Sequence, residues 1–177
     1  LSRLVRKMLD LSRLNALAEH SITAQETFDL TEVVSQVLIS LESKITDRKL
    51  DVDVQMPQEK LMVWGDPDSV TQVCYNLLDN AIKFSTRGTA IRLSIQTKGR
   101  KAYVSVRNMG ETIPPEELDK IFDRFHKTDK SRSLDKDGVG LGLYIVKTIL
   151  KTHGEQITVT SRDGVTAFRF TVQLAKA

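Results

Sequence analysis

Residues 76–84, which read Asn-Leu-Leu-Asp-Asn-Ala-Ile-Lys-Phe, are the stretch around which the rest of the chain is best understood. At a helical period, Asn76, Asn80 and Lys83 fall with Gln72 on one narrow polar stripe. The apolar face beside it comprises Val70, Val73, Leu77, Ala81 and Phe84. Polar side chains on the edge of a buried helix are unfavourable unless a polar partner meets them.

A metal-bound polyphosphate would be such a partner. The amide oxygen of Asn is a hard, uncharged ligand, and Mg²⁺ keeps most of its coordination sites for water and phosphate. Lys83, one turn further on, could reach the same anion. The alternative is a half-buried helix in which Asn76 and Asn80 only satisfy neighbouring backbone groups.

The sequence also predicts where this helix starts and ends. Asp66 suits the N-cap, Pro67 the first helical position, and Asp68 the positive end of the helix dipole. Residues 85–88, Ser-Thr-Arg-Gly, are expected to end the helix. The single cysteine, Cys74, lies on its buried side and is expected to be a core residue, because one cysteine forms no internal disulfide.

Length and charge indicate one well-cored domain with a short appendage. The 177 residues carry a net charge of +3 with acids and bases interspersed, which gives little reason to expect nucleic acid as a partner. No apolar run approaches the ~18 residues of a membrane span, and no signal-peptide pattern opens the chain. Since the sequence starts without Met, we expect it to be a piece of a longer protein whose missing part could hold a membrane anchor.

The first residues form a separate unit in this interpretation. Leucines and other apolar residues recur at three- and four-residue steps through residues 1–17, which predicts an amphipathic helix. Either it packs on the following domain or it belongs to a helical bundle completed by other chains, and the bundle is favoured. Residues 19–27 are polar and predict a linker, so residues 1–27 and 28–177 are assigned to two domains.

The remaining pattern predicts a two-layer α/β sandwich, with a mixed, mostly antiparallel sheet covered on one face by about three helices. Besides the helix from Pro67 to Phe84, helices are expected from Asp29 to about Arg48, from about Glu116 to Phe122 and over 141–152. Strands are expected over 50–56, 61–64, 91–95, 103–106, 157–160 and 168–174, with hairpin turns at 97–100 and 163–164 and a loop over 107–115.

A second informative stretch is residues 137–143, Asp-Gly-Val-Gly-Leu-Gly-Leu, at the start of a predicted helix. Gly138, Gly140 and Gly142 let the backbone approach a phosphate closely, and the N–H groups of the helix start then face the anion. Alone, the triplet also fits an ordinary flexible loop. The charged segment before it, residues 126–137, is expected to be mobile, and its Lys127, Lys130 and Arg132 suit a lid that closes on phosphates or a solvated loop.

Taken together, these motifs resemble the ATP-binding catalytic domain of sensor histidine kinases, in the superfamily shared with gyrase, heat-shock chaperone ATPases and MutL-type repair proteins. The resemblance covers roughly residues 28–174 and implies that fold, with ATP and Mg²⁺ as ligands. It implies Asn80 as the metal ligand and Asn76, Lys83 and Lys127 as catalytic residues at the phosphates. The other nucleotide-binding residues that it implies are Phe84, Asn108, Gly110, Ile113, Phe122, Lys130, Gly138, Val139, Gly140, Leu141, Gly142, Leu143 and Thr166.

The chain departs from this family between residues 108 and 113. The family usually has Asp followed by Gly-x-Gly, whereas Asn108 replaces the Asp and Thr112 replaces the second Gly. Asn keeps an acceptor for the adenine amino group and adds a donor, so we expect adenine recognition to survive. Thr112 removes a flexible position from the loop.

Asn76 distinguishes the kinase from its relatives. Gyrase-type and chaperone ATPases carry Glu four residues before the metal-binding Asn, and Asn76 cannot take a proton from water as that Glu does. The resemblance therefore implies a histidine kinase that acts by positioning and charge neutralisation. His20, His126 and His153 lack the context of an acceptor, which is expected upstream of Leu1, and His153 is expected to cap a helix beside Gly154.

Partners and location follow from the same resemblance. It implies phosphotransfer to a histidine on a dimerisation domain, of which residues 1–27 resemble the second hairpin helix with its linker. It further implies a response regulator partner, a homodimeric full-length protein, and a cytoplasmic position beneath an inner or plasma membrane. The alternatives are a degenerate, kinase-dead binding module and a scaffold without a ligand.

Overall fold

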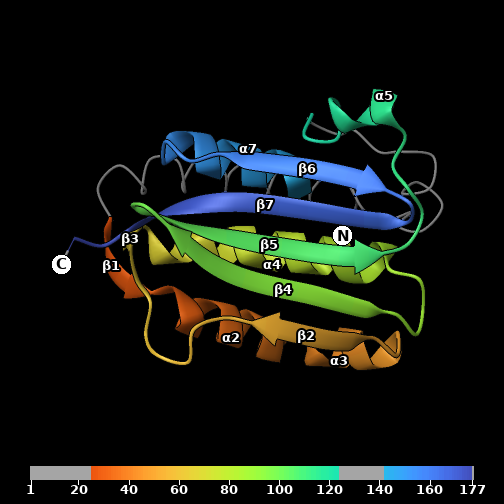
Figure 1. Cartoon of the computed structure of the whole chain (residues 1–177), viewed down its shortest axis with the longest axis horizontal. Coiled ribbons are helices and arrows are strands. Elements are labelled where there is room, and N and C mark those ends of the chain that lie inside the picture. The colour runs from red at the N-terminus through yellow and green to blue at the C-terminus, as the bar shows by residue number, and fades with distance from the viewer. Residues whose placement is uncertain (1–24, 124–141, 177) are drawn as a thin grey trace, which may run out of the picture.

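The computed structural model describes residues 25–123 and 142–176, which form a twisted sheet with helices on one face (Figure 1). The predicted N-terminal helix, the linker residues before Gln25 and the charged segment 126–137 lie outside the described residues. The same is true of six expected site residues, namely Lys127, Lys130, Gly138, Val139, Gly140 and Leu141.

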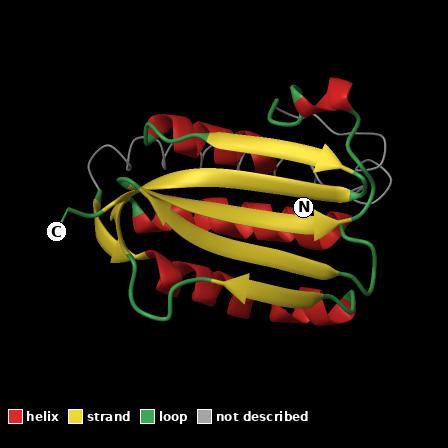
Figure 2. Cartoon of the chain, viewed as in Figure 1, coloured by secondary structure: helices red, strands yellow, loops and turns green. Residues whose placement is uncertain are grey.

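The described strands form one seven-stranded sheet in the order β1-β3-β7-β5-β4-β2, with β6 paired to β7 off this path (Figure 2). The strands are β1 (Glu26–Asp29), β2 (Asp51–Gln55), β3 (Met62–Gly65), β4 (Ala90–Lys98), β5 (Lys101–Met109), β6 (Ile157–Arg162) and β7 (Val165–Leu174). Only the β2–β4 pair is parallel among the described pairs, so the sheet is mixed and mostly antiparallel, as predicted.

Strand β7 is central because it pairs along its length with β5 and on its other side with two strands in turn. Its first part pairs with β6 through the tight turn at Asp163 and Gly164, both of which have positive φ. Its last residues pair with β3. The predicted hairpin turns at 97–100 and 163–164 are therefore confirmed.

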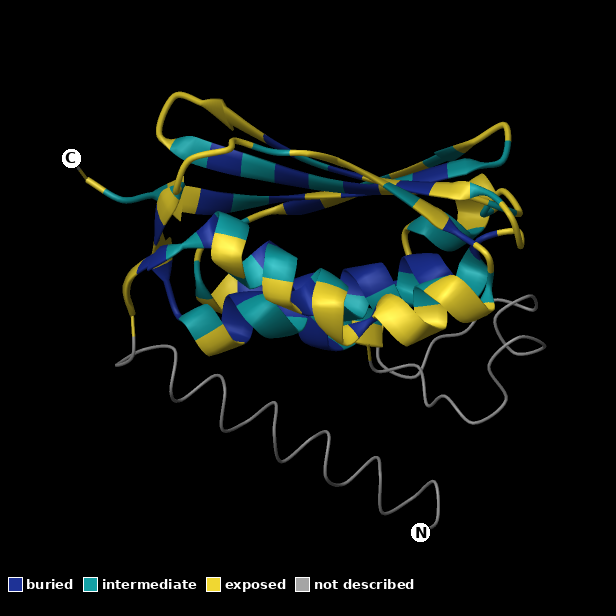
Figure 3. Cartoon of the chain, turned by 90° about the horizontal axis from the view of Figure 1, so that it is seen from below, coloured by how far each residue is buried: buried dark blue, intermediate teal, exposed yellow. Residues whose placement is uncertain are grey.

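The helices lie on one face of the sheet, and no helix of the described residues lies on the other face (Figure 3). They are α2 (Leu30–Ser40), α3 (Glu42–Asp47), α4 (Pro67–Phe84), α5 (Pro115–Leu118) and α7 (Gly142–Thr152), of which α5 is a single turn near the end of β6. Helix α4 starts and stops as predicted: Asp66 caps it by accepting from the backbone N–H of Asp68, and Ser85 is its C-cap.

Several expectations about element boundaries are wrong. The single helix predicted from Asp29 to Arg48 is broken at Leu41, where the Ser40 hydroxyl donates to the Val37 carbonyl (2.7 Å) and competes with the helical ladder. The linker expected up to residue 27 ends earlier, because Glu26 and Thr27 pair with β3. Strand β5 continues into the loop expected from residue 107, and the helix expected over 116–122 shortens to α5.

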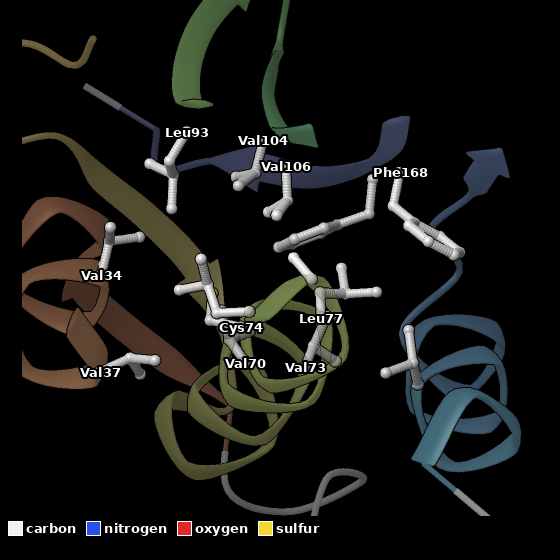
Figure 4. Packing of buried hydrophobic residues seen from close by; sticks show 14 of the residues in the cluster. Val34, Val37, Val70, Val73, Cys74, Leu77, Leu93, Val104, Val106 and Phe168 are labelled. Carbon is white, nitrogen blue, oxygen red and sulfur yellow. The ribbon is translucent and has the colours of Figure 1, made fainter. Parts of the chain in front are cut away.

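The core lies between the sheet and the helices (Figure 4). Val70, Val73 and Leu77 of α4 point toward Val106 and Phe168 of the sheet, and Val34 and Val37 of α2 approach from one side. Cys74 belongs to this core, as predicted, and its burial raises the pKa of the thiol to about 12. A thiol with so high a pKa stays protonated at neutral pH and is a poor nucleophile.

Asp29 joins β1, α2 and the start of β3. Its Oδ1 accepts from the Thr31 hydroxyl (2.7 Å), the Thr31 amide (3.0 Å) and the Leu61 amide (3.1 Å). Burial raises the pKa of this carboxyl, but hydrogen bonds from the Thr31 hydroxyl and from the backbone of Leu61, Thr31 and Glu32 outweigh it, so the pKa falls below its ordinary value of 3.8. A lowered pKa stabilises the fold above pH ~4, and this stabilisation is lost as the pH falls through the folded-state pKa.

Asp29→Asn should therefore lower the free energy of unfolding by about 1 kcal/mol near neutral pH, and the difference from the native chain should shrink below pH ~4. Urea unfolding at pH 7 and pH 3 measures both values. Asp47→Asn, at an exposed position of α3, is the control and should change neither. A difference that does not depend on pH would contradict the role of the charge.

Candidate functional site

The polar stripe of α4 meets the first residue of α7. The Gln72 side-chain amide donates to Oδ1 of Asn76 (2.7 Å), and Nδ2 of Asn76 donates to the carbonyl of Gly142 (3.2 Å). The two helices lie side by side on the sheet (Figure 1). The amide stripe and the last glycine of the triplet, which are 66 residues apart in sequence, are therefore in direct contact.

Further along the same stripe, Asn80 is half-buried, and Lys83 forms an ion pair with Asp79 of the same helix. Nζ of Lys83 lies 3.2 Å from Oδ2 of Asp79, and Nζ of Lys44 lies 3.0 Å from the other oxygen of the same carboxylate. The hydrogen bond to Asp79 raises the pKa of Lys44. Asp79 forms ion pairs with both lysines, so it would keep its pair with Lys44 if Lys83 turned toward an anion.

A second polar cluster lies where β5 and β7 approach their neighbouring turns. Asn108 of β5 and Thr166 of β7 are partners in strand register, and each is only 5% exposed. Both occupy the core side of the sheet, in line with buried Val106 and Phe168. In the part of the chain that the structure describes, no hydrogen bond holds the Asn108 amide. An amide on the inner face of the sheet that no described residue bonds fits a site for a polar ligand edge.

The Thr166 hydroxyl belongs to a short relay of hydrogen bonds. It lies 2.7 Å from the Ser161 hydroxyl, which accepts from the backbone N–H of Ile113 (2.8 Å). Ile113 and Thr166 were predicted as site residues, whereas Ser161 was not. A polar residue following Ile157 and Val159 at a spacing of two was the signal for it, since it places Ser161 on the inner face.

Gly110 connects the two clusters. Its N–H donates to the carbonyl of Gly164 (2.8 Å), and it forms a bridge to Ser85 at the end of α4. A Cβ at this position would lie well within 3.0 Å of the carbonyl oxygen of Phe84, so only glycine fits without a shift. Thr112, which stands in place of the family's second glycine, accepts from the N–H of Gly164 (2.7 Å) and ties the same turn.

Aromatic and apolar residues lie beside the two polar clusters of the candidate site. Phe122 packs edge-to-face on Phe168, with ring centroids 6.1 Å apart, and Nζ of Lys147 lies 5.6 Å from the Phe122 ring. Leu143 is partly buried against the core. The predicted site residues that the structure describes fall into two main groups. Helices α4 and α7 hold Asn76, Asn80, Lys83, Phe84, Gly142 and Leu143. Around the adjacent ends of β5 and β7 lie Asn108, Gly110, Ile113 and Thr166, and Phe122 packs on Phe168 of β7.

His153 has the structural role predicted for it. Its Nδ1 lies 2.9 Å from the Ile149 carbonyl, and Nε2 accepts from the backbone N–H of Asp66 (3.3 Å), which links the end of α7 to the start of α4. Gly154, with φ 71°, follows at the end of α7. His20 and His126 lie outside the described residues.

Two further findings apply to residues 25–123 and 142–176. No three His, Cys, Asp or Glu side chains gather there in a way that could hold a metal ion. No helix among these residues combines the length and apolar character that a membrane crossing needs.

Comparison with known proteins gives one consistent result. The family model described as histidine kinase-, DNA gyrase B-, and HSP90-like ATPase matches residues 65–176. The sensor protein SrrB of Staphylococcus aureus is 32% identical over 165 residues, and the sensor histidine kinase CusS of Escherichia coli O157:H7 is 34% identical over 168 residues. These alignments cover 93% and 95% of this chain but only 28% and 34% of the relatives, so the chain spans about a third of their length or less.

Solved structures agree with the sequence relatives. The catalytic domain of the histidine kinase ThkA superposes with a TM-score of 0.75 at 31% identity, covering 85% of this chain and 95% of that domain. ThkA in complex with the response regulator protein TrrA superposes with a TM-score of 0.72 at 29% identity, covering 95% of this chain and 49% of that one.

Proposed function

Because this chain belongs to the histidine kinase-, DNA gyrase B-, and HSP90-like ATPase family, with the fold of histidine kinase catalytic domains, we propose that it binds Mg-ATP and donates the γ-phosphate to a histidine on a separate helical domain. The observation that carries this proposal is the contact between the Asn76 amide and the Gly142 carbonyl. It joins the two motifs expected to hold one triphosphate, the α4 stripe and the start of α7.

The ligand fits the residues present. Asn108 offers an amide on the inner face of the sheet to the edge of a base, and Thr166 lies beside it. Asn80 offers a neutral oxygen of the type that Mg²⁺ accepts alongside phosphate oxygens. Bound Mg²⁺ would supply charge neutralisation at the phosphates. Lys83, and Lys127 and Lys130 outside the described residues, would provide the further positive charge.

Asn76 favours phosphotransfer over hydrolysis. Its amide takes no proton at neutral pH, and it is already engaged by Gln72 and Gly142. A neutral imidazole nitrogen needs no base to become nucleophilic, whereas water does. The chain's own residues would therefore bind, orient and neutralise the triphosphate, while the acceptor comes from another domain.

Partners and location are part of the same proposal. The acceptor lies on a dimerisation hairpin of the same protein, which is a homodimer at full length, and a response regulator takes the phosphoryl group onward. The ThkA–TrrA complex supports the latter partner. Because the relatives SrrB and CusS are sensor proteins, we propose that the full-length protein is a membrane sensor with this chain on its cytoplasmic side.

The test is phosphotransfer in trans. The chain is incubated with labelled ATP, Mg²⁺ and a separately produced acceptor hairpin from the same protein. The expected product is labelled hairpin whose phosphate is lost in acid and retained in base, as for phosphohistidine. An acid-stable phosphoester would contradict the histidine assignment.

A second candidate function is a nucleotide-binding module without kinase activity. The changes to Asn108 and Thr112 favour it, because Thr112 ties the loop to Gly164 where a glycine would leave it free. Calorimetry with a non-hydrolysable ATP analogue separates binding from transfer. Binding without label on the hairpin would support this second function.

A further inference from the structure

We infer that the base site of this chain accepts 6-oxo purines, such as hypoxanthine and guanine, as well as adenine. The inference rests on the proposed nucleotide site and names its substrate class. It is carried by the polar groups at the buried end of β5 and β7, none of which has a fixed direction of hydrogen bonding.

Asn108 is the first of these groups. Its side chain is on the core side of β5, and the residue is only 5% exposed. A carboxamide has one acceptor oxygen and one donor nitrogen of nearly equal size. Since no described residue hydrogen-bonds the Asn108 amide, either atom can face the ligand.

The hydroxyl relay is the second group. Ser161 and Thr166 share a hydrogen bond of 2.7 Å in which either oxygen can be the donor. The Ile113 N–H occupies one acceptor position on Ser161 and leaves its proton free to rotate. The Thr166 hydroxyl, beside Asn108 in the strand register, can therefore donate or accept toward a ligand.

These two groups match both kinds of purine edge. With its oxygen toward position 6, Asn108 accepts from the 6-amino group of adenine and donates to N1. With the amide turned over, the nitrogen donates to a 6-oxo group and the oxygen accepts from N1–H. A carboxylate could not make this exchange, because at position 6 it pairs with an amino group and repels an oxo group.

Isothermal titration of the chain with ATP and with ITP, each with Mg²⁺, tests the inference. ITP is the first probe because it changes position 6 without adding the 2-amino group of guanine. The native chain should bind the two with dissociation constants within about tenfold of each other. The matched variant Asn108→Asp should favour ATP by about 100-fold or more, since a buried group facing the wrong partner is strongly rejected.

The outcomes distinguish this inference from the function on which it rests. If neither nucleotide binds the native chain, the proposed function fails. If ATP binds and ITP is weaker by 100-fold or more in the native chain, the relaxed base selectivity is overturned while the proposed function stands. An unchanged ratio in a folded Asn108→Asp variant would likewise overturn the role of Asn108. The comparison within the native chain decides the question even if that variant fails to fold.

Discussion

Asn80→Ala should abolish the magnesium dependence of ATP binding and lower the affinity for Mg-ATP by about 100-fold, or about 2.8 kcal/mol. Asn80 lies one turn after Asn76 on the stripe that meets Gly142, and it is half-buried at the edge of α4. Removing its oxygen takes away the protein ligand expected for the metal, whereas the contacts of Asn76 remain. Titrations of ATP with Mg²⁺ and with EDTA measure the affinity in each condition.

The fold should tolerate this substitution. Asn80 is outside the buried face of α4, and Ala is the better helix former, so the free energy of unfolding should change by less than about 0.5 kcal/mol. Thr71→Ala is the matched control, because Thr71 lies off the stripe of α4 and its hydroxyl donates to the Pro67 carbonyl in its own helix. A folded Asn80→Ala chain that still binds ATP more tightly with Mg²⁺ than with EDTA would contradict the assignment of Asn80.

Helix α4 could be predicted in full from the sequence because each of its signals is local. Asp66 and Pro67 fix its start, and the 3.6-residue period separates the polar stripe from the buried face. The order of the site motifs was also predictable, since the resemblance placed them along the chain. The direct contact between Asn76 and Gly142 is tertiary, and it follows from the packing of α4 on α7.

Several of the misses share a physical cause, which is non-local pairing. Glu26 and Thr27 are polar and do not show the apolar alternation of a strand, yet β3 supplies their backbone partners. The spacing of Ser161 after Val159 places it on the inner face, but its part in the site depends also on Ile113, 48 residues away, which donates to it. The bond between Lys83 and Asp79 is within one helix turn and could have been read from the sequence, whereas the placement of Lys44 beside it depends on the packing of α3.

Thr112, which departs from the family pattern, has a structural role in the loop after β5. The sequence predicted only the loss of a flexible position. In the structure, the Thr112 hydroxyl and the Gly110 N–H bind the two backbone groups of Gly164, so the loop after β5 is fixed to the β6–β7 turn from both sides. Such a fixed loop favours a preorganised base site over one that closes on its ligand.

Gly110→Ala should have the largest effect on stability. The new methyl group would overlap the Phe84 carbonyl oxygen, and this oxygen belongs to the backbone at the end of α4, so it cannot rotate away. The helix end, the Ser85 bridge and the bond to Gly164 would all have to move. We expect the free energy of unfolding to fall by about 3 kcal/mol, with a decrease in Tm of roughly 6–12 °C.

Gly99→Ala separates this clash from the general effect of losing a glycine. Gly99 has φ 61° in the β4–β5 turn, and nothing lies within 4 Å of a Cβ there, so its substitution should destabilise the fold by only about 1 kcal/mol. Thermal and urea unfolding of both variants give the comparison. Because Gly110 lies two residues after Asn108, its variant should also weaken ATP binding at temperatures where it remains folded, whereas Gly99→Ala should not. Equal destabilisation of the two variants would show that α4 and β5 are not held at the distance on which the site depends.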